Sequence, residues 1–254
     1  MVDTSEFVQQ VCKLKGKMPN FVCFTEQQRE DFKFFLSQKS GYPVGVDRTF
    51  NLGSFYVTAL VYKNVRVVRS DDPSNHTITL GPIFLHRDGN FEAYNYFFSA
   101  IKGALCESVD AFELSLGNDI HIGSDEEKAL TKAIDSNFPA ARRFLCSKHL
   151  KEGTIAYMQK VVGIPQKKRK SISKLIFGDD GIANADSSFS FNSKSTDILS
   201  SISKYPKFSD YFRTRLKPTL EYYVNTPSQN SPDTPKLWTN NIYDRGAYPH
   251  LIES

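Results

Sequence analysis

The chain has 254 residues, 40% of them apolar and 13% aromatic, which is enough for a sizeable core in one large domain or in a domain with an insertion. Its 32 basic and 28 acidic residues give a net charge of only +4. No apolar run of about 18 residues is present, which excludes a transmembrane helix. The first residues lack the apolar stretch of a secretory signal peptide, so none is expected.

The charge and the cysteines are unevenly spread. Residues 1–150 carry 17 basic and 18 acidic side chains, whereas residues 151–254 carry 15 and 10. The basic excess of the second part suits a polyanionic partner, but a solvated surface explains it equally well. The four cysteines form no Cys-x-x-Cys pair, which is typical of a reducing, intracellular compartment, either nucleus or cytoplasm.

The first part of the chain predicts one helix and three strands. Thr25 has the spacing of an N-cap to Gln28, which predicts a helix over 25–38. The β-branched and aromatic residues that follow predict two strands joined by a turn at 51–53. A third strand is predicted over 78–86.

The next segments alternate between helix and strand. Their apolar spacing predicts, in chain order, a helix over 90–105, a strand over 111–122, a helix over 125–138, a strand over 143–146 and a helix to about 162. Ser124 and Glu127 have the spacing of a capping box, which would make Asp125 the first residue of its helix.

Three consecutive strands followed by strand–helix alternation predict an α/β fold with a mixed sheet flanked by helices, the layout of a ribonuclease H-like fold. The part after residue 165 contains a basic cluster, a Gly/Ser-rich loop at 178–195, two helices near 196–203 and 208–224, and an extended Pro-rich stretch. The predicted domains are an N-terminal helical extension (1–40), a ribonuclease H-like core (41–162), a mostly helical insertion or C-terminal subdomain (163–241) and a divergent tail (242–254).

Two acidic residues are candidates for a metal site. Asp47 lies inside a predicted strand, where a buried carboxylate is costly unless it is paired or bound to a metal. In a ribonuclease H-like sheet the strand of Asp47 would neighbour the strand before Asp125. Two close carboxylates repel one another unless a divalent cation bridges them. For Asp125 alone, the dipole of the following helix is a sufficient explanation.

The sequence resembles the transposase domain of Mutator-like elements, within the DDE superfamily. The resemblance rests on "GVDRTFNLGSFYVTALVYKN", on "GSDEEKALTKAIDSNFPAARRFLCSKHL" and on the strand–helix unit between them, covers about 41–162, and continues weakly toward Asn241. It implies that Asp47 and Asp125 are the first two catalytic acids, that they bind Mg²⁺ or Mn²⁺, and that the protein cuts and joins DNA.

The resemblance also implies a third acid, a glutamate on a helix after a Trp-x-x-Asn segment. Here only 13 residues follow Asn241, without an apolar helical period, and Glu253 is next to the last residue. Glu221 lies on a predicted helix but before the expected position. We therefore expect the third acid to be missing, the domain to be C-terminally truncated and catalysis to be impaired.

Two further motifs have open interpretations. Cys146 and His149 form a Cys-x-x-His motif that would contact DNA or support the site. A structural zinc site would require a second pair of ligands, which is not evident in the sequence. The remaining alternative is that the two residues pack at the end of a strand. The basic run of Lys167, Lys168, Arg169 and Lys170 would contact phosphates or direct nuclear import, or form a solvated loop.

Three functions are therefore compatible with the sequence. The first is a transposase-derived enzyme or its impaired descendant, the second a non-catalytic module that binds DNA or protein, and the third a metal-dependent nuclease that uses another acid, such as Glu221. DNA is the expected partner, a homo-oligomer remains open, and no membrane association is expected.

Overall fold

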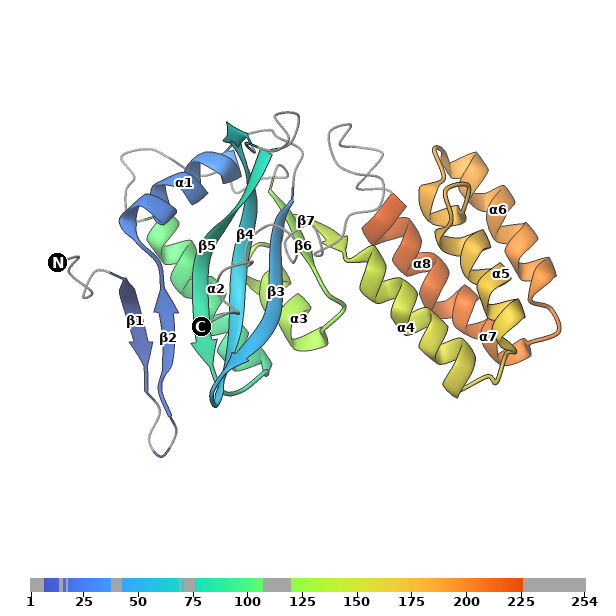
Figure 1. Cartoon of the computed structure of the whole chain (residues 1–254), viewed down its shortest axis with the longest axis horizontal. Coiled ribbons are helices and arrows are strands. Elements are labelled where there is room, and N and C mark those ends of the chain that lie inside the picture. Colours follow the sequence, from blue (N-terminus) through green and yellow to red (C-terminus); the bar gives the residue numbers. More distant parts are fainter. Residues whose placement is uncertain are drawn as a thin grey trace. The chain divides into compact units, whose positions relative to one another are not determined.

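The computed structural model describes residues 7–13, 16, 18–37, 43–68, 70, 76–106 and 120–225. These residues form an α/β protein with two compact units, whose boundary lies within the last strand at Arg142 and Arg143. The first unit contains a mixed sheet with helices, and the second is helical (Figure 1).

The described strands form one sheet of seven, in the order β1-β2-β5-β4-β3-β6-β7. Pairing is antiparallel from β1 to β3, whereas β3 and β6 run parallel, which makes the sheet mixed. The strands are β1 (Val8–Cys12), β2 (Asn20–Cys23), β3 (Val44–Leu52), β4 (Phe55–Val68), β5 (His76–His86), β6 (His121–Ser124) and β7 (Arg142–Leu145).

The predicted hairpin is present as β3 and β4, but its turn is shorter than expected. Leu52 pairs with Phe55, so Gly53 and Ser54 alone connect the two strands. Gly53 has a φ of +59°, in the left-handed region that glycine tolerates best. The prediction of a turn at 51–53 is therefore wrong by about two residues, because cross-strand pairing continues to Leu52.

Strands β1 and β2 were not predicted. They lie within the segment expected to be a helical extension, and they add a hairpin to the edge of the sheet next to β5 (Figure 1). The sequence of β1, VQQVC, is short and does not alternate between apolar and polar residues, and four of its five residues are exposed. An edge strand of this kind lacks the periodicity on which strand prediction depends.

Helix α1 (Glu26–Ser37) has the predicted capping box. The amide of Gln28 donates to Thr25 Oγ1 at 3.1 Å, and the amide of Thr25 donates to Gln28 Oε1 at 2.8 Å. The helix buries Phe32 against the ring of Tyr62, with ring centroids 6.2 Å apart.

Helices α2 (Phe91–Cys106) and α3 (Lys128–Asn137) pack on one face of the sheet. Val46, Leu60 and Phe84 from the central strands form the main core together with side chains of these two helices. Burial of this apolar face is the main favourable term that holds strands and helices together.

The start of α3 differs from the prediction. The helix begins at Lys128 with Glu127 as its N-cap, and Ser124 is the buried last residue of β6, where its hydroxyl donates to the carbonyl of Asp125. The predicted capping box of Ser124 and Glu127 is therefore wrong, because β6 continues to Ser124 through its pairing with β3. Asp125 lies in the strand–helix connection rather than in the first turn of a helix.

The second unit has its own apolar core. Its elements are α4 (Ser147–Lys160), α5 (Gln166–Phe177), η2 (Ile182–Asn184), α6 (Ser188–Ser201), α7 (Pro206–Tyr211), η3 (Phe212–Leu216), α8 (Lys217–Leu220) and η4 (Glu221–Asn225). The helical character was predicted, but the loop expected over 178–195 already contains η2 and the start of α6. Ser187 caps α6 by accepting from the amide of Ser190, at 3.2 Å.

The predicted Pro-rich stretch, Trp238, Asn241 and the tail lie outside the described residues. Within the described ranges, no helix is long and apolar enough to cross a bilayer.

The turn at Gly53 gives a direct test of the hairpin that positions Asp47. Replacing Gly53 with Ala should lower the free energy of unfolding by about 1–2 kcal/mol, because an L-residue with a Cβ is strained in the left-handed region. Gly53→Asn should cost less, since asparagine tolerates this conformation. Urea denaturation of both variants measures the difference, and an equal loss for the two would contradict the assigned turn.

Candidate functional site

The parallel pairing of β3 with β6 relates the segments of the two predicted acids. It places Val44 beside Ile122 and Gly45 beside Gly123. Extended by two residues along each chain, the same register would set Asp47 opposite Asp125, which is the first residue past the end of β6. Neighbouring strands lie about 4.8 Å apart, so this extension would bring the two backbones close together.

The two acids also share a face of the sheet. Val44 and Ile122 both belong to the core beneath the helices, and side chains alternate between the two faces of a strand. Asp47, three residues after Val44, therefore points to the face opposite α2 and α3, and the same alternation from Ile122 places Asp125 there. Both side chains are partly buried, which makes an uncompensated pair of charges unfavourable.

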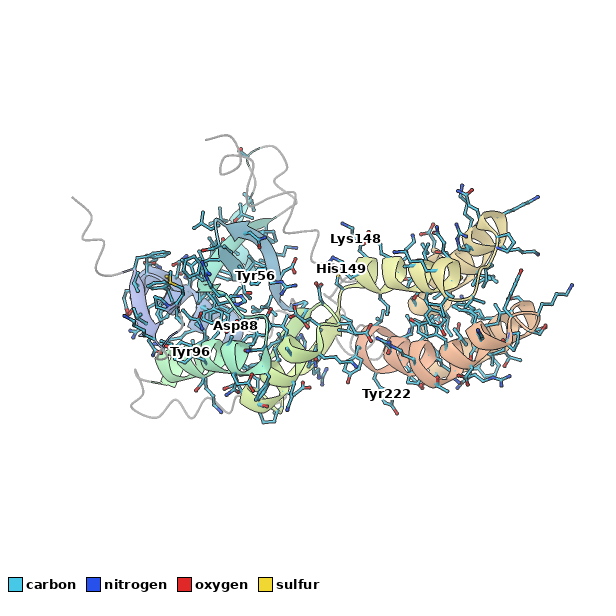
Figure 2. The ribbon with its side chains drawn as sticks, turned by 90° about the horizontal axis from the view of Figure 1, so that it is seen from below. Tyr56, Asp88, Tyr96, Lys148, His149 and Tyr222 are labelled. Carbon is cyan, nitrogen blue, oxygen red and sulfur yellow. The ribbon has the colours of Figure 1, made fainter. Side chains whose placement is uncertain are left out.

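The Cys-x-x-His motif lies at the start of the helical unit. Cys146 follows the end of β7 and is the N-cap residue of α4, and His149 lies in the first turn of that helix (Figure 2).

The chemistry of this motif differs from that of a pair of carboxylates. Thiolate and imidazole suit Zn²⁺, whereas carboxylate oxygens suit Mg²⁺ and Mn²⁺. Cys146 is buried and is in no disulfide, and His149 is half-buried. The motif supplies two ligands, whereas a zinc site takes at least three from the protein.

Glu127 connects the segments that carry the two acids. It accepts a hydrogen bond from the hydroxyl of Tyr94 on α2, at 3.1 Å to Oε1, and lies 3.8 Å from Nη1 of Arg48. The Arg48 guanidinium in turn lies over the ring of Tyr56, 4.8 Å from its centroid. Because Arg48 follows Asp47 and Glu127 comes two residues after Asp125, these contacts tie the two acid-bearing segments together. Burial, with the Glu127 charge beside it, raises the pKa of Tyr94.

His86, the last residue of β5, is a buried polar residue whose ring lies beside that of Tyr94. Its Nδ1 lies 3.0 Å from the carbonyl oxygen of Asp88 and its Nε2 lies 2.8 Å from Thr58 Oγ1, while its ring stacks on Phe84. A carbonyl can only accept, so the proton of the neutral ring resides on Nδ1 and Nε2 accepts from Thr58. Burial lowers the pKa of His86, and the Asp88 carbonyl opposes part of this shift.

The networks of Glu127 and His86 were not predicted from the sequence. No local pattern links Tyr94 to Glu127 or Thr58 to His86, because each pair is 28 or more residues apart. A weak signal was present in the three consecutive acids at 125–127, of which the third occupies the N-cap position of α3.

The remaining candidates belong to the helical unit or lie outside the described residues. The basic run occupies the first turns of α5 rather than a loop, with Lys167, Lys168 and Lys170 exposed and Arg169 half-buried. Glu221 starts η4 in the same unit, and Glu253 is not described.

A comparison of the chain with models of known protein families found no match, and neither did a comparison with curated proteins. The functional argument therefore depends on the residues and their geometry.

The buried His86 predicts a dependence of stability on pH. Because its pKa is lower in the folded than in the unfolded state, the unfolded state takes up the proton first as the pH falls below about 6.5. The free energy of unfolding should therefore fall between about pH 7 and pH 5, by at most about 1.4 kcal/mol per pH unit from this residue.

The substitution His86→Gln should remove the contribution of this residue to the slope of unfolding free energy against pH. The control His76→Gln, at the other end of β5, should retain that contribution. Denaturation curves measured across this pH range provide the comparison. A slope unchanged in His86→Gln would contradict a neutral, buried His86.

Proposed function

We propose that the sheet unit is the core of a DNA-cleaving and DNA-joining enzyme of the Mutator-like DDE type, or of its impaired descendant. The observation that carries the proposal is the parallel register of β3 and β6, which, extended by two residues, would set Asp47 and Asp125 at one level and on one face of the sheet. Paired carboxylates of this kind are a ligand set for Mg²⁺ or Mn²⁺.

The strand order adds support for a ribonuclease H-like core. The order β5-β4-β3-β6-β7, with a meander of three antiparallel strands followed by alternating helices and strands, is the order expected for that fold. In it the first strand of the meander neighbours the strand that precedes the second acid, as β3 neighbours β6. The hairpin of β1 and β2 is then an addition at the sheet edge.

In the proposed mechanism, Asp47 and Asp125 would hold divalent cations on the face opposite α2 and α3. Bound divalent cations would activate water and stabilise the leaving oxygen of the phosphodiester. Tyr94 and Arg48 position the segment of Asp125 through Glu127. The Cys146–His149 motif would contact the nucleic acid from the start of α4.

A non-catalytic binding module is the second candidate function. It is favoured by the place of Glu221, the described candidate for a third acid, which belongs to the helical unit and not to the sheet unit of Asp47 and Asp125. In that case the fold would bind DNA or protein without cleaving it, and a metal at Asp125 would be structural.

Nicking of supercoiled plasmid DNA in the presence of Mn²⁺ or Mg²⁺ tests the proposal. The wild type should nick the plasmid, and Asp47→Asn and Asp125→Asn should each lower the rate by about a hundredfold or more, because each removes a charged metal ligand without changing side-chain size. Asp135→Asn, on the exposed side of α3, is the matched control and should retain the wild-type rate.

Two results would contradict the enzyme proposal. One is nicking that survives both substitutions. The other is a wild-type protein that binds DNA but does not nick it with either metal, which would support the binding module.

A further inference from the structure

We infer that the second unit binds the phosphodiester backbone of DNA in a groove between α4 and α5. This inference deepens the proposed function and rests on it for the identity of the polyanion, but it concerns residues far along the chain from the two acids.

The groove has a volume of about 450 Å³ and lies within the helical unit. Its apolar floor includes Ile155 and Phe177, which pack in the core of this unit. Polar and basic side chains form the rest, and none of the lining residues is acidic. The lining residues are Lys151, Ile155, Gln166, Arg169, Lys170, Ser173, Lys174, Phe177 and Gly178.

Helical spacing places the basic residues along one side of α5. Gln166, Lys170 and Lys174 are four residues apart, so they lie on one face of the helix, and Lys151 faces them from α4. Lys170 and Lys174 are separated by about 6 Å along the helix axis. One DNA strand carries a charge about every 3.4 Å along the duplex axis, so a single strand in the groove would meet both ammonium groups.

The charge of the two helices is strongly biased. Together α4 and α5 carry eight lysines and arginines and one acidic residue, Glu152, which does not line the groove. Lys151, Lys170 and Lys174 are exposed. Arg169 is partly engaged, because its Nη1 donates to the carbonyl of Ile164 at 2.6 Å, and it thereby braces the connection between the helices.

A second groove on the same unit shows that the excess of basic side chains is confined to the region of α4 and α5. It has a volume of about 410 Å³ and is lined by residues of α5, α6 and the segment between them, including Asp180, Asp197 and Lys194. Lys194 is paired with Asp180. A polyanion would be repelled by these carboxylates, so the α4–α5 groove is the one with complementary charge.

The concave shape favours a nucleic-acid strand over a membrane. A bilayer surface is flat and would contact the rims of the groove, whereas a phosphodiester chain fits within it. The structure also divides the predicted basic run. Arg169 and Lys170 line the groove together with Lys174 further along α5, while Lys167 and Lys168 on the same helix do not.

This division supplies a matched pair of variants for full-length protein. Binding of a labelled DNA duplex is followed by fluorescence anisotropy in EDTA, at salt concentrations from about 50 to 200 mM. Lys170→Gln/Lys174→Gln should weaken binding by about tenfold or more and reduce the slope of log K against log salt by about 2, one for each lost phosphate contact. Lys167→Gln/Lys168→Gln, with the same change in net charge, should stay within about threefold of the wild type.

Equal losses in the two double variants, or no loss in Lys170→Gln/Lys174→Gln, would overturn the groove assignment. Binding of the wild type to anionic phospholipid vesicles but not to the duplex would also overturn it. Because EDTA removes divalent cations, this binding measurement does not depend on the carboxylate site. DNA binding in the groove by a protein that does not nick DNA would contradict only the proposed enzyme. Equal DNA affinities of the two double variants would contradict only the groove.

Discussion

The parallel pairing of β3 with β6 is the constraint on which the rest of the site depends. Two consecutive residue pairs fix the register, and the alternation of side chains then determines which face receives Asp47 and Asp125. A shift of one residue in either strand would turn its acid into the apolar core beneath α2 and α3. The burial of Val44, Val46 and Ile122 therefore stabilises the register on which the proposed pair of carboxylates depends.

Polar contacts of Glu127 connect the segments of the two acids on the face of the sheet that α2 and α3 cover. Glu127 is the N-cap residue of α3, and its carboxylate accepts from Tyr94 and faces Arg48, so that the start of α3 is joined to α2 and β3. Each contact is individually modest, since the side chains of Arg48 and Glu127 are partly exposed. Their combined effect is to limit how far the strand–helix connection of Asp125 can move relative to Asp47, which is what a site for small cations requires.

Much of the first unit could be predicted because its signals are local. The β-branched residues of β4 and the reciprocal cap of Thr25 and Gln28 specify their elements within a few residues, whereas β1 is a short, polar edge strand without such a signal. The start of α3 was predicted too early. Ser124 and Glu127 have the spacing of a capping box, but Ser124 belongs to strand β6, which is held by pairing with strands distant in the sequence. The same limit applies to the site: the pairing of the two acids stays a prediction from the strand pattern, while the contacts of Glu127 and His86 depend on residues far apart in sequence.

The central claim is that Asp47 and Asp125 form one metal site, and calorimetric titration with Mn²⁺ tests it most directly. The account predicts that the wild type binds, that Asp47→Ala and Asp125→Ala each abolish most of the affinity, and that the double variant loses little more, because residues of one site are not additive. Absence of binding in the wild type, or unchanged affinity after either single substitution, would contradict the claim and leave the fold as a scaffold whose carboxylates serve no shared cation.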